Sequence, residues 1–554
     1  MLEENSKTKE EIELNKAIEA IIKSPSRKKL IVAGPGSGKT TLFKKILQLN
    51  PGLSNRRIVL TFINILKNDL ERDLFGLAQV HTFHSFCLGL LHHYTLLGEG
   101  LSPDFIFFPG LAGLIVHDWE IINKTDSPKF VGEMRDLLKD NHINFYLARG
   151  NYYNAVDFDD SVYRAYAGLL AKKARIKKYD LVLIDEYQDF NRLEAEIINL
   201  LGNDNPIIIV GDDDQALYSQ LRNSSWEHIR SLYQSGEYEV FNLPFCLRCP
   251  KVIVSAVGDI LNKAISINKL QGRIDKPFKH FPPAKEADSI KYPKIVCIET
   301  SVQSKKINYI GRYIVQEISK IPENEVEDAI QGNYPVVLVI AMEPYRKQII
   351  EFLEKNKIEV EKRDERDNDL NREKGISILK NNPDSNLGWR IVLDFDKPAF
   401  LYEIILATMD TGVPLIELIP KDYRDSILAE VDKFIPPDEQ FDSNSKEQVT
   451  QEKRFPIVRV TSFEGSKGMS AQHVFIAGLH NKELPRNPDS IKDLEICKFL
   501  VGLTRTRKKC TLIYTKRFGI FKKIPSVFIT WINQGRLDKL IVNKYYWDKG
   551  ERKS

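Results

Sequence analysis

The sequence predicts an α/β protein whose two domains are built on parallel β-sheets, each interrupted by a mostly helical insertion. Short apolar runs without polar alternation recur along the chain, and helix-length amphipathic stretches follow them. Such runs are typical of strands buried on both faces of a parallel sheet, and their alternation with helices indicates a layered α/β architecture. The strand-like runs span residues 29–33, 57–62, 181–184, 207–210, 336–340, 457–461, 473–477 and 511–514.

The strand-like runs form two groups that separate near residue 245. Two stretches break the alternation, one aromatic-rich and helix-like, the other apolar at its start and polar at its end. The adjacent prolines Pro282 and Pro283 indicate a linker or loop. The predicted division is a first sheet domain at 1–90 and 175–245, a helical insertion at 91–174, a second sheet domain at 246–375 and 456–535, a short second insertion at 376–455, and a C-terminal tail at 536–554.

Composition is ordinary for a soluble globular chain: of 554 residues, 42% are hydrophobic and 28% charged. We found no apolar run of the roughly 18 residues that a membrane span needs, and the polar N-terminal segment is unlike a secretory signal. The six cysteines are scattered, as suits a reducing cytoplasm. We therefore expect a cytoplasmic protein with no membrane partner. The net charge of +4 neither favours nor excludes a nucleic-acid partner.

A glycine-rich segment, AGPGSGKTT, lies between the first strand-like run and a helix-like stretch. Glycines allow a tight turn whose backbone N–H groups surround phosphate oxygens at a helix N-terminus. Lys39 is placed to reach the β- and γ-phosphates, and the Thr40 hydroxyl to hold Mg²⁺. The residues predicted to bind the nucleotide are Gly34, Pro35, Gly36, Ser37, Gly38, Lys39, Thr40 and Thr41.

Two adjacent carboxylates end the strand-like segment LVLIDEYQD at 181–189. At the carboxyl end of a buried strand, Asp185 can bind Mg²⁺ and Glu186 can accept a proton from an attacking water. Alone, such a pair is more often a surface turn. Together with the glycine-rich loop, it supplies both parts of a metal–phosphate site and predicts triphosphate hydrolysis.

Further short motifs follow in a fixed order. They are TFIN at 61–64, HTFHSF at 81–86, DFDD at 157–160, GDDDQALY at 211–218, LRCP at 247–250, FEGSKGMS at 463–470 and VGLTRTR at 501–507. With the two motifs above, this series resembles the UvrD/Rep/PcrA helicases of superfamily one over most of the chain. The resemblance implies two RecA-like P-loop NTPase domains with ATP and Mg²⁺ bound between them.

The resemblance also implies roles for three polar residues. Gln215 is expected to sense the γ-phosphate and position water, and Arg248 and Arg505 are expected to reach across from the second domain as arginine fingers. A forked, permanently charged guanidinium suits the spread charge of a transferring phosphoryl group.

For a DNA strand, the resemblance implies stacking on Phe62 and Tyr218 and polar contacts from Asn64, Thr82 and His84. Stacking suits a motor because every base has a π-face, so that binding tolerates any sequence. Gln220 stands where the family has a tryptophan, which puts strong strand separation in doubt.

The adenine contacts of the family are absent. Residues 1–47 contain no glutamine, and the positions that usually contact base and ribose hold Thr41, Leu247 and Ser470. We therefore expect relaxed base selectivity, with GTP or CTP also used. A lone CxxC, Cys246 and Cys249, lacks further metal ligands nearby and is better explained by packing.

The predicted function is an ATP-dependent single-stranded DNA translocase or helicase, with the 3′-to-5′ polarity that the resemblance implies. The expected partner is single-stranded or tailed duplex DNA, and a separate nuclease or a repair or defence protein is a further candidate. The alternative is a DNA-stimulated regulatory NTPase, a subunit of a repair or anti-phage defence complex, with little or no unwinding.

Overall fold

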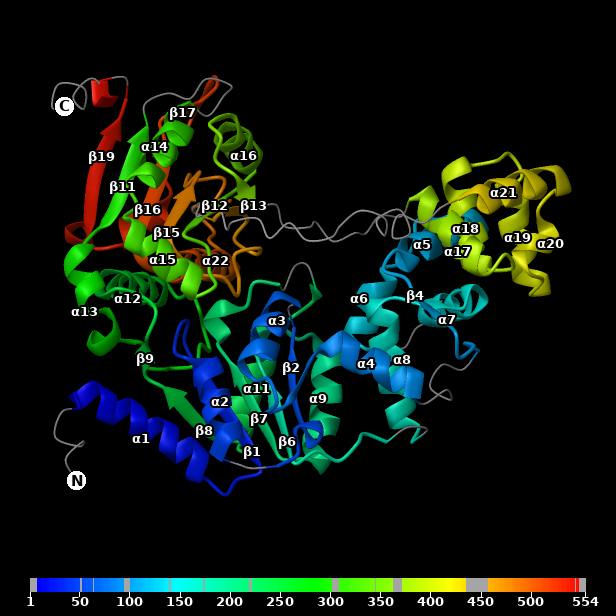
Figure 1. Cartoon of the computed structure of the whole chain (residues 1–554), viewed down its shortest axis with the longest axis horizontal. Coiled ribbons are helices and arrows are strands. Elements are labelled where there is room, and N and C mark those ends of the chain that lie inside the picture. The colour runs from blue at the N-terminus through cyan, green and yellow to red at the C-terminus, as the bar shows by residue number, and fades with distance from the viewer. Residues whose placement is uncertain are drawn as a thin grey trace, which may run out of the picture.

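A computed structural model shows two parallel sheets covered by helices and a helical body that extends away from the first sheet (Figure 1). The structure describes residues 7–49, 52–62, 64–93, 100–138, 141–172, 175–218, 222–300, 308–343, 345–361, 371–434, 457–543 and 545–547.

The first sheet has six parallel strands in the order β3-β2-β6-β7-β1-β8. They are β1 (Lys28–Ala33), β2 (Arg57–Thr61), β3 (Gln79–Thr82), β6 (Leu181–Ile184), β7 (Ile207–Gly211) and β8 (Glu239–Leu243). Around this sheet the chain forms α1 (Lys9–Lys23), α2 (Lys39–Leu49), α3 (Asn64–Asp73), α4 (Phe83–His93), α9 (Arg192–Asp204) and α11 (Trp226–Ser235). The central strands are buried on both faces, as their unbroken apolar sequences require.

The second sheet has seven parallel strands in the order β13-β14-β12-β15-β16-β11-β19. They are β11 (Ile295–Thr300), β12 (Val337–Ala341), β13 (Val360–Glu361), β14 (Val458–Thr461), β15 (Ala471–Ala477), β16 (Thr506–Thr515) and β19 (Leu537–Val542). The helices of this part are α12 (Lys251–Ser266), α13 (Pro282–Lys291), α14 (Asn308–Ser319), α15 (Glu323–Gln331), α16 (Tyr345–Lys355), α22 (Asp493–Thr504) and α23 (Val527–Trp531).

Two sequence expectations are wrong in this half of the chain. The predicted tail at 536–554 contains β19, which pairs with β11 as an edge strand of the second sheet. Pro282 and Pro283 do not form a loop but occupy the first turn of α13, where a missing N–H costs no helical hydrogen bond.

The helical body combines segments from both predicted insertions. The first contributes α5 (Leu111–Asn123), α6 (Phe130–Arg135), α7 (Asn141–Tyr153) and α8 (Phe158–Leu170), and the second α17 (Arg372–Asn381), α18 (Asn386–Asp396), α19 (Leu401–Thr411), α20 (Leu415–Leu418) and α21 (Lys421–Lys433). One hydrophobic cluster joins them, and in Figure 1 α17 and α18 lie beside α5. Buried Asp118 of α5 accepts hydrogen bonds from Arg149 Nε at 2.8 Å and, across the two insertions, from Arg390 Nε at 2.9 Å.

Three two-stranded pairs complete the fold: β4 (Ile106–Phe107) with β5 (Ala155–Val156), β9 (Phe245–Cys246) with β10 (Lys279–His280), and β17 (Arg517–Phe518) with β18 (Phe521–Lys522). The α/β fold class with large parallel sheets is confirmed. None of the helices in the described residues combines the length and apolar character needed to cross a membrane.

Candidate active site

The glycine-rich loop connects β1 to α2 and packs against the second domain. Gly36 and Gly38 have φ values of 70° and 86°, a left-handed conformation that side chains disfavour. A Cβ on Gly36 would lie 2.5 Å from the Cβ of Arg248, so only glycine allows the two chains to approach this closely. Glycine is therefore required at both positions for the turn, and at Gly36 also for the contact with the second domain.

A cavity of ≈ 400 Å³ opens above this loop, and residues of both sheet domains line it. Of the predicted nucleotide-binding residues, those from Pro35 to Thr41 line the cavity, while Gly34 lies behind it against Phe278. All of the predicted catalytic and metal-binding residues also line it: Thr40, Asp185, Glu186, Gln215, Arg248 and Arg505.

Lys39 and Glu186 form an ion pair across the floor of the cavity, with Nζ and Oε1 2.5 Å apart. Burial opposes the charge of Glu186, but the positive charges of Lys39 and Lys467 outweigh it and lower the pKa of Glu186 to about 2. Glu186 also has a φ of 52°, which is unusual for a non-glycine residue and frequent at functional sites. Glu186 is therefore an ionised carboxylate at neutral pH, and its pairing with Lys39 makes it a weak base in this arrangement.

Asp185 and Thr40 offer a carboxylate and a hydroxyl to the same cavity. Burial raises the pKa of Asp185 to about 6, so that a cation would stabilise its ionised form. Mg²⁺ usually keeps several waters and phosphate oxygens among its ligands and needs only a few oxygen donors from the protein. A site with two such donors beside a phosphate-binding loop therefore fits Mg²⁺. These two side chains are the ones that would hold the ion.

Gln215 of the first domain forms a hydrogen bond with Arg505 of the second domain. Its Nε2 donates to Asp212 Oδ2 at 2.8 Å, while its Oε1 accepts from Arg505 at 3.0 Å. Arg505 is 2% exposed, and its other contacts are two backbone carbonyl groups and the hydroxyl of Thr504. Burial lowers the pKa of Arg505 to about 9. Among the described residues no carboxylate pairs with Arg505 or Arg248, so both guanidiniums are available to an anionic ligand.

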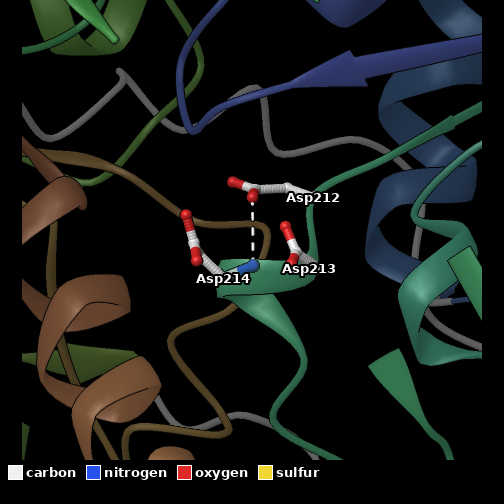
Figure 2. Close-up of side chains that lie close together, drawn as sticks. All are labelled: Asp212, Asp213 and Asp214. Carbon is white, nitrogen blue, oxygen red and sulfur yellow. Dashed lines mark hydrogen bonds between the residues drawn. The ribbon is translucent and has the colours of Figure 1, made fainter. Parts of the chain in front are cut away.

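Three consecutive aspartates, Asp212, Asp213 and Asp214, bring carboxylate oxygens within 4.8 Å of one another (Figure 2). They already have a cation: Lys276 Nζ lies 2.9, 2.5 and 2.8 Å from Asp212, Asp213 and Asp214, respectively. Arg273 pairs with Asp214 as well, at 2.8 Å. The cluster is therefore an internal ion network, and its effect is to hold Asp212 as the acceptor that orients Gln215.

We predict that Lys276→Met destabilises the protein by about 3–5 kcal/mol, because it leaves three buried carboxylates without their shared ammonium. Urea unfolding monitored by tryptophan fluorescence measures this loss. Lys279→Met is the matched control, since Lys279 is half exposed and pairs with Glu13 at the surface. Equal stability of the two variants would contradict the role given to Lys276.

The sequence alone predicts no role for Lys467, although the FEGSKGMS motif contains it. This buried lysine bonds to Asp189 at 2.6 Å and to the carbonyl of Gln215, and so joins the second domain to two motifs of the first. A lysine between a serine and a glycine gives little signal in a single sequence, and only the folded contact reveals it.

Three of the residues predicted to contact DNA, Phe62, His84 and Tyr218, lie in one cluster on the first domain. Phe62 is 7% exposed, lies 5.8 Å from the Tyr218 ring, and has the Arg222 guanidinium 4.1 Å from its own ring centre. Thr82 and His84 are buried, and His84 contacts Arg222 at 3.0 Å. The Asn64 side chain and Gln220 lie outside the described residues. DNA contact by this cluster stays a prediction.

Cys246 and Cys249 are buried free thiols, and Cys249 contacts the carbonyl of Thr504 at 3.5 Å. Phe83 and Phe86, which belong to the HTFHSF motif, are buried in the core of the first domain.

A family model described as an AAA domain matches residues 16–220. Curated relatives include the ATP-dependent DNA helicase UvrD1 of Mycobacterium tuberculosis, 28% identical over an alignment of 243 residues that covers 34% of this chain and 31% of the relative. DNA helicase II of Haemophilus influenzae is 25% identical over 324 residues, 49% of this chain and 44% of its own. The ATP-dependent DNA helicase Rep of Escherichia coli is 29% identical over 235 residues, 34% of each chain. The matched region thus spans less than half of each relative.

Proposed function

We propose that this UvrD/Rep-like chain hydrolyses ATP to move along single-stranded DNA. The observation that carries the proposal is the composition of the cavity, with Lys39 and Glu186 from the first domain and Arg248 and Arg505 from the second. A site that needs both domains couples their approach to the state of the nucleotide. Repeated closing and reopening of the two domains during hydrolysis can move the protein along a DNA strand.

In the proposed reaction, the triphosphate displaces Glu186 from Lys39, whose ammonium then holds the β- and γ-phosphates. Glu186 accepts the proton of the attacking water, which Gln215 orients. Arg505 and Arg248 neutralise charge on the transferring phosphoryl group. Mg²⁺, when bound at Thr40 and Asp185, supplies further charge neutralisation.

The names of the relatives support DNA as the partner, since each is described as a DNA helicase. The cluster of Phe62, Tyr218 and His84 is the proposed contact surface for a single strand, and the 3′-to-5′ polarity follows from the resemblance alone. A separate nuclease or a repair or defence protein is proposed as a further partner.

We expect single-stranded DNA to stimulate ATP hydrolysis at least about tenfold, because strand binding favours the closed, catalytically complete arrangement. Steady-state phosphate release with and without a polythymidine oligonucleotide measures this. An equal rate of ATP hydrolysis with and without the oligonucleotide would contradict the proposed movement along DNA. Unwinding of 3′-tailed and 5′-tailed duplexes, compared in parallel, then tests polarity.

One observation favours the alternative, a DNA-stimulated regulatory NTPase in a repair or defence complex. Arg222 covers a face of Phe62, so this ring can stack on a base only after Arg222 moves. Stimulated hydrolysis without unwinding of either duplex would support this function over a helicase.

A further inference from the structure

The cavity continues beyond the phosphate loop to a wall formed by Tyr334, Ser470 and Arg507. Tyr334 precedes β12, Ser470 immediately precedes β15, and Arg507 is the second residue of β16. Because these strands are parallel members of one sheet, their amino-terminal ends lie along the same edge. That edge faces the phosphate loop across the cavity.

Arg507 is held in a defined orientation on this wall. Its guanidinium lies 3.8 Å from the ring centre of Tyr334, and its Nε donates to Ser470 Oγ at 2.8 Å. An arginine that stacks on an aromatic ring and is fixed at Nε loses little further entropy when it binds a ligand.

The charge of Arg507 is partly buried and lies near a second positive charge, that of Arg248. Burial and the neighbouring charge of Arg248 lower the pKa of Arg507 to about 10. Its contacts are a hydroxyl and an aromatic ring, and among the described residues no carboxylate pairs with it. A guanidinium has five N–H donors, of which the bond to Ser470 uses one, so Arg507 can also donate to acceptor atoms of a ligand.

The position of the phosphates on the glycine-rich loop determines which part of a bound nucleotide lies near Arg507. Lys39 fixes the β- and γ-phosphates, and Glu186 and Arg505 enclose the γ end. The rest of the cavity, from Thr41 and Leu247 to Arg507, is then left for the ribose and the base. Thr41 and Leu247 are the positions at which this chain lacks the usual adenine contacts.

We propose that Arg507 reads the nucleobase and favours bases with two adjacent acceptors, as guanine has in O6 and N7. Adenine offers N7 alone on this edge, and its 6-amino group is a donor that opposes a guanidinium. The inference rests on the proposed function, nucleoside triphosphate hydrolysis, and names its substrate class: purine triphosphates with GTP at least equal to ATP.

The test is calorimetric binding of non-hydrolysable ATP, GTP and ITP analogues to the full chain, wild type and Arg507→Met, with Mg²⁺. ITP shares O6 and N7 with GTP but lacks the 2-amino group, so it isolates the proposed contact. We expect Arg507→Met to raise Kd for the GTP and ITP analogues about tenfold and to leave Kd for the ATP analogue within about twofold. Lys508→Met, which removes the neighbouring cation paired with Asp328, is the control and should change none of the three.

Equal weakening of all three analogues in Arg507→Met would overturn the inference, because Arg507 would then act on phosphate or ribose. Failure of the GTP and ITP analogues to bind the wild type would overturn it as well. Ser470→Ala removes the Nε partner and should shift the same two analogues in the same direction by a smaller factor. Binding without turnover would leave the base preference standing while refuting the hydrolytic function.

Discussion

Replacing Lys39 with alanine is expected to abolish triphosphate hydrolysis, with a loss of at least about 10²–10³-fold in kcat. Lys39 is the cavity-lining cation that α2 contributes at its first residue, directly after the phosphate loop. Its ammonium is the group that stabilises charge between the β- and γ-phosphates in the proposed reaction. No neighbouring side chain of α2 can replace it, because Thr40 and Thr41 carry no charge.

Phosphate release measures this loss, and fluorescence anisotropy of a labelled oligonucleotide measures DNA binding. Binding of DNA should be retained, because Phe62 and Tyr218 lie outside the phosphate loop. Lys44→Ala is the matched control, since Lys44 lies on the exposed face of the same helix. Turnover retained in Lys39→Ala would refute the site assignment.

The strands that sequence predicted are those buried on both faces, such as β1, β7 and β12. These strands are recognisable in the sequence as continuous apolar runs, because both of their faces are buried and disfavour polar residues. The strands that it missed include the edge strands β8 and β19, whose exposed residues interrupt the run. An edge strand is held by its one neighbour and needs no continuous apolar sequence.

The phosphate and metal groups of the site could be predicted because each lies within one short segment next to a strand. Lys276, by contrast, meets Asp212 and Asp213 from a stretch some sixty residues away, and nothing in its local sequence indicates that contact. The same holds for Arg507 and Tyr334, which stack although they belong to different strand–helix units. Contacts made only by the tertiary fold leave no local pattern.

The sequence also did not predict that the two insertions share one hydrophobic core. Asp118 and Arg390 are ordinary charged residues in amphipathic sequence, yet both are buried and paired. The sequence marks each insertion as helical, but not the partner against which its apolar face packs.

Glu186→Gln is expected to separate nucleotide binding from hydrolysis. The amide keeps the size of the carboxylate but cannot accept the proton of water, so kcat should fall about 10²–10⁴-fold. At the same time the substitution removes the carboxylate that pairs with Lys39 at 2.5 Å. A triphosphate then no longer competes with Glu186 for this ammonium, and its affinity should stay equal or rise.

Phosphate release and binding of a fluorescent nucleotide, measured on the same preparation, distinguish these effects. Glu194→Gln is the control, because Glu194 is also a buried carboxylate of the first domain but pairs with Arg222, away from Lys39. Weaker nucleotide binding in Glu186→Gln would mean that the carboxylate holds Lys39 in its binding position. Full hydrolysis would assign the proton acceptor to another group, and the cavity offers Asp185 as the remaining buried carboxylate next to the phosphate loop.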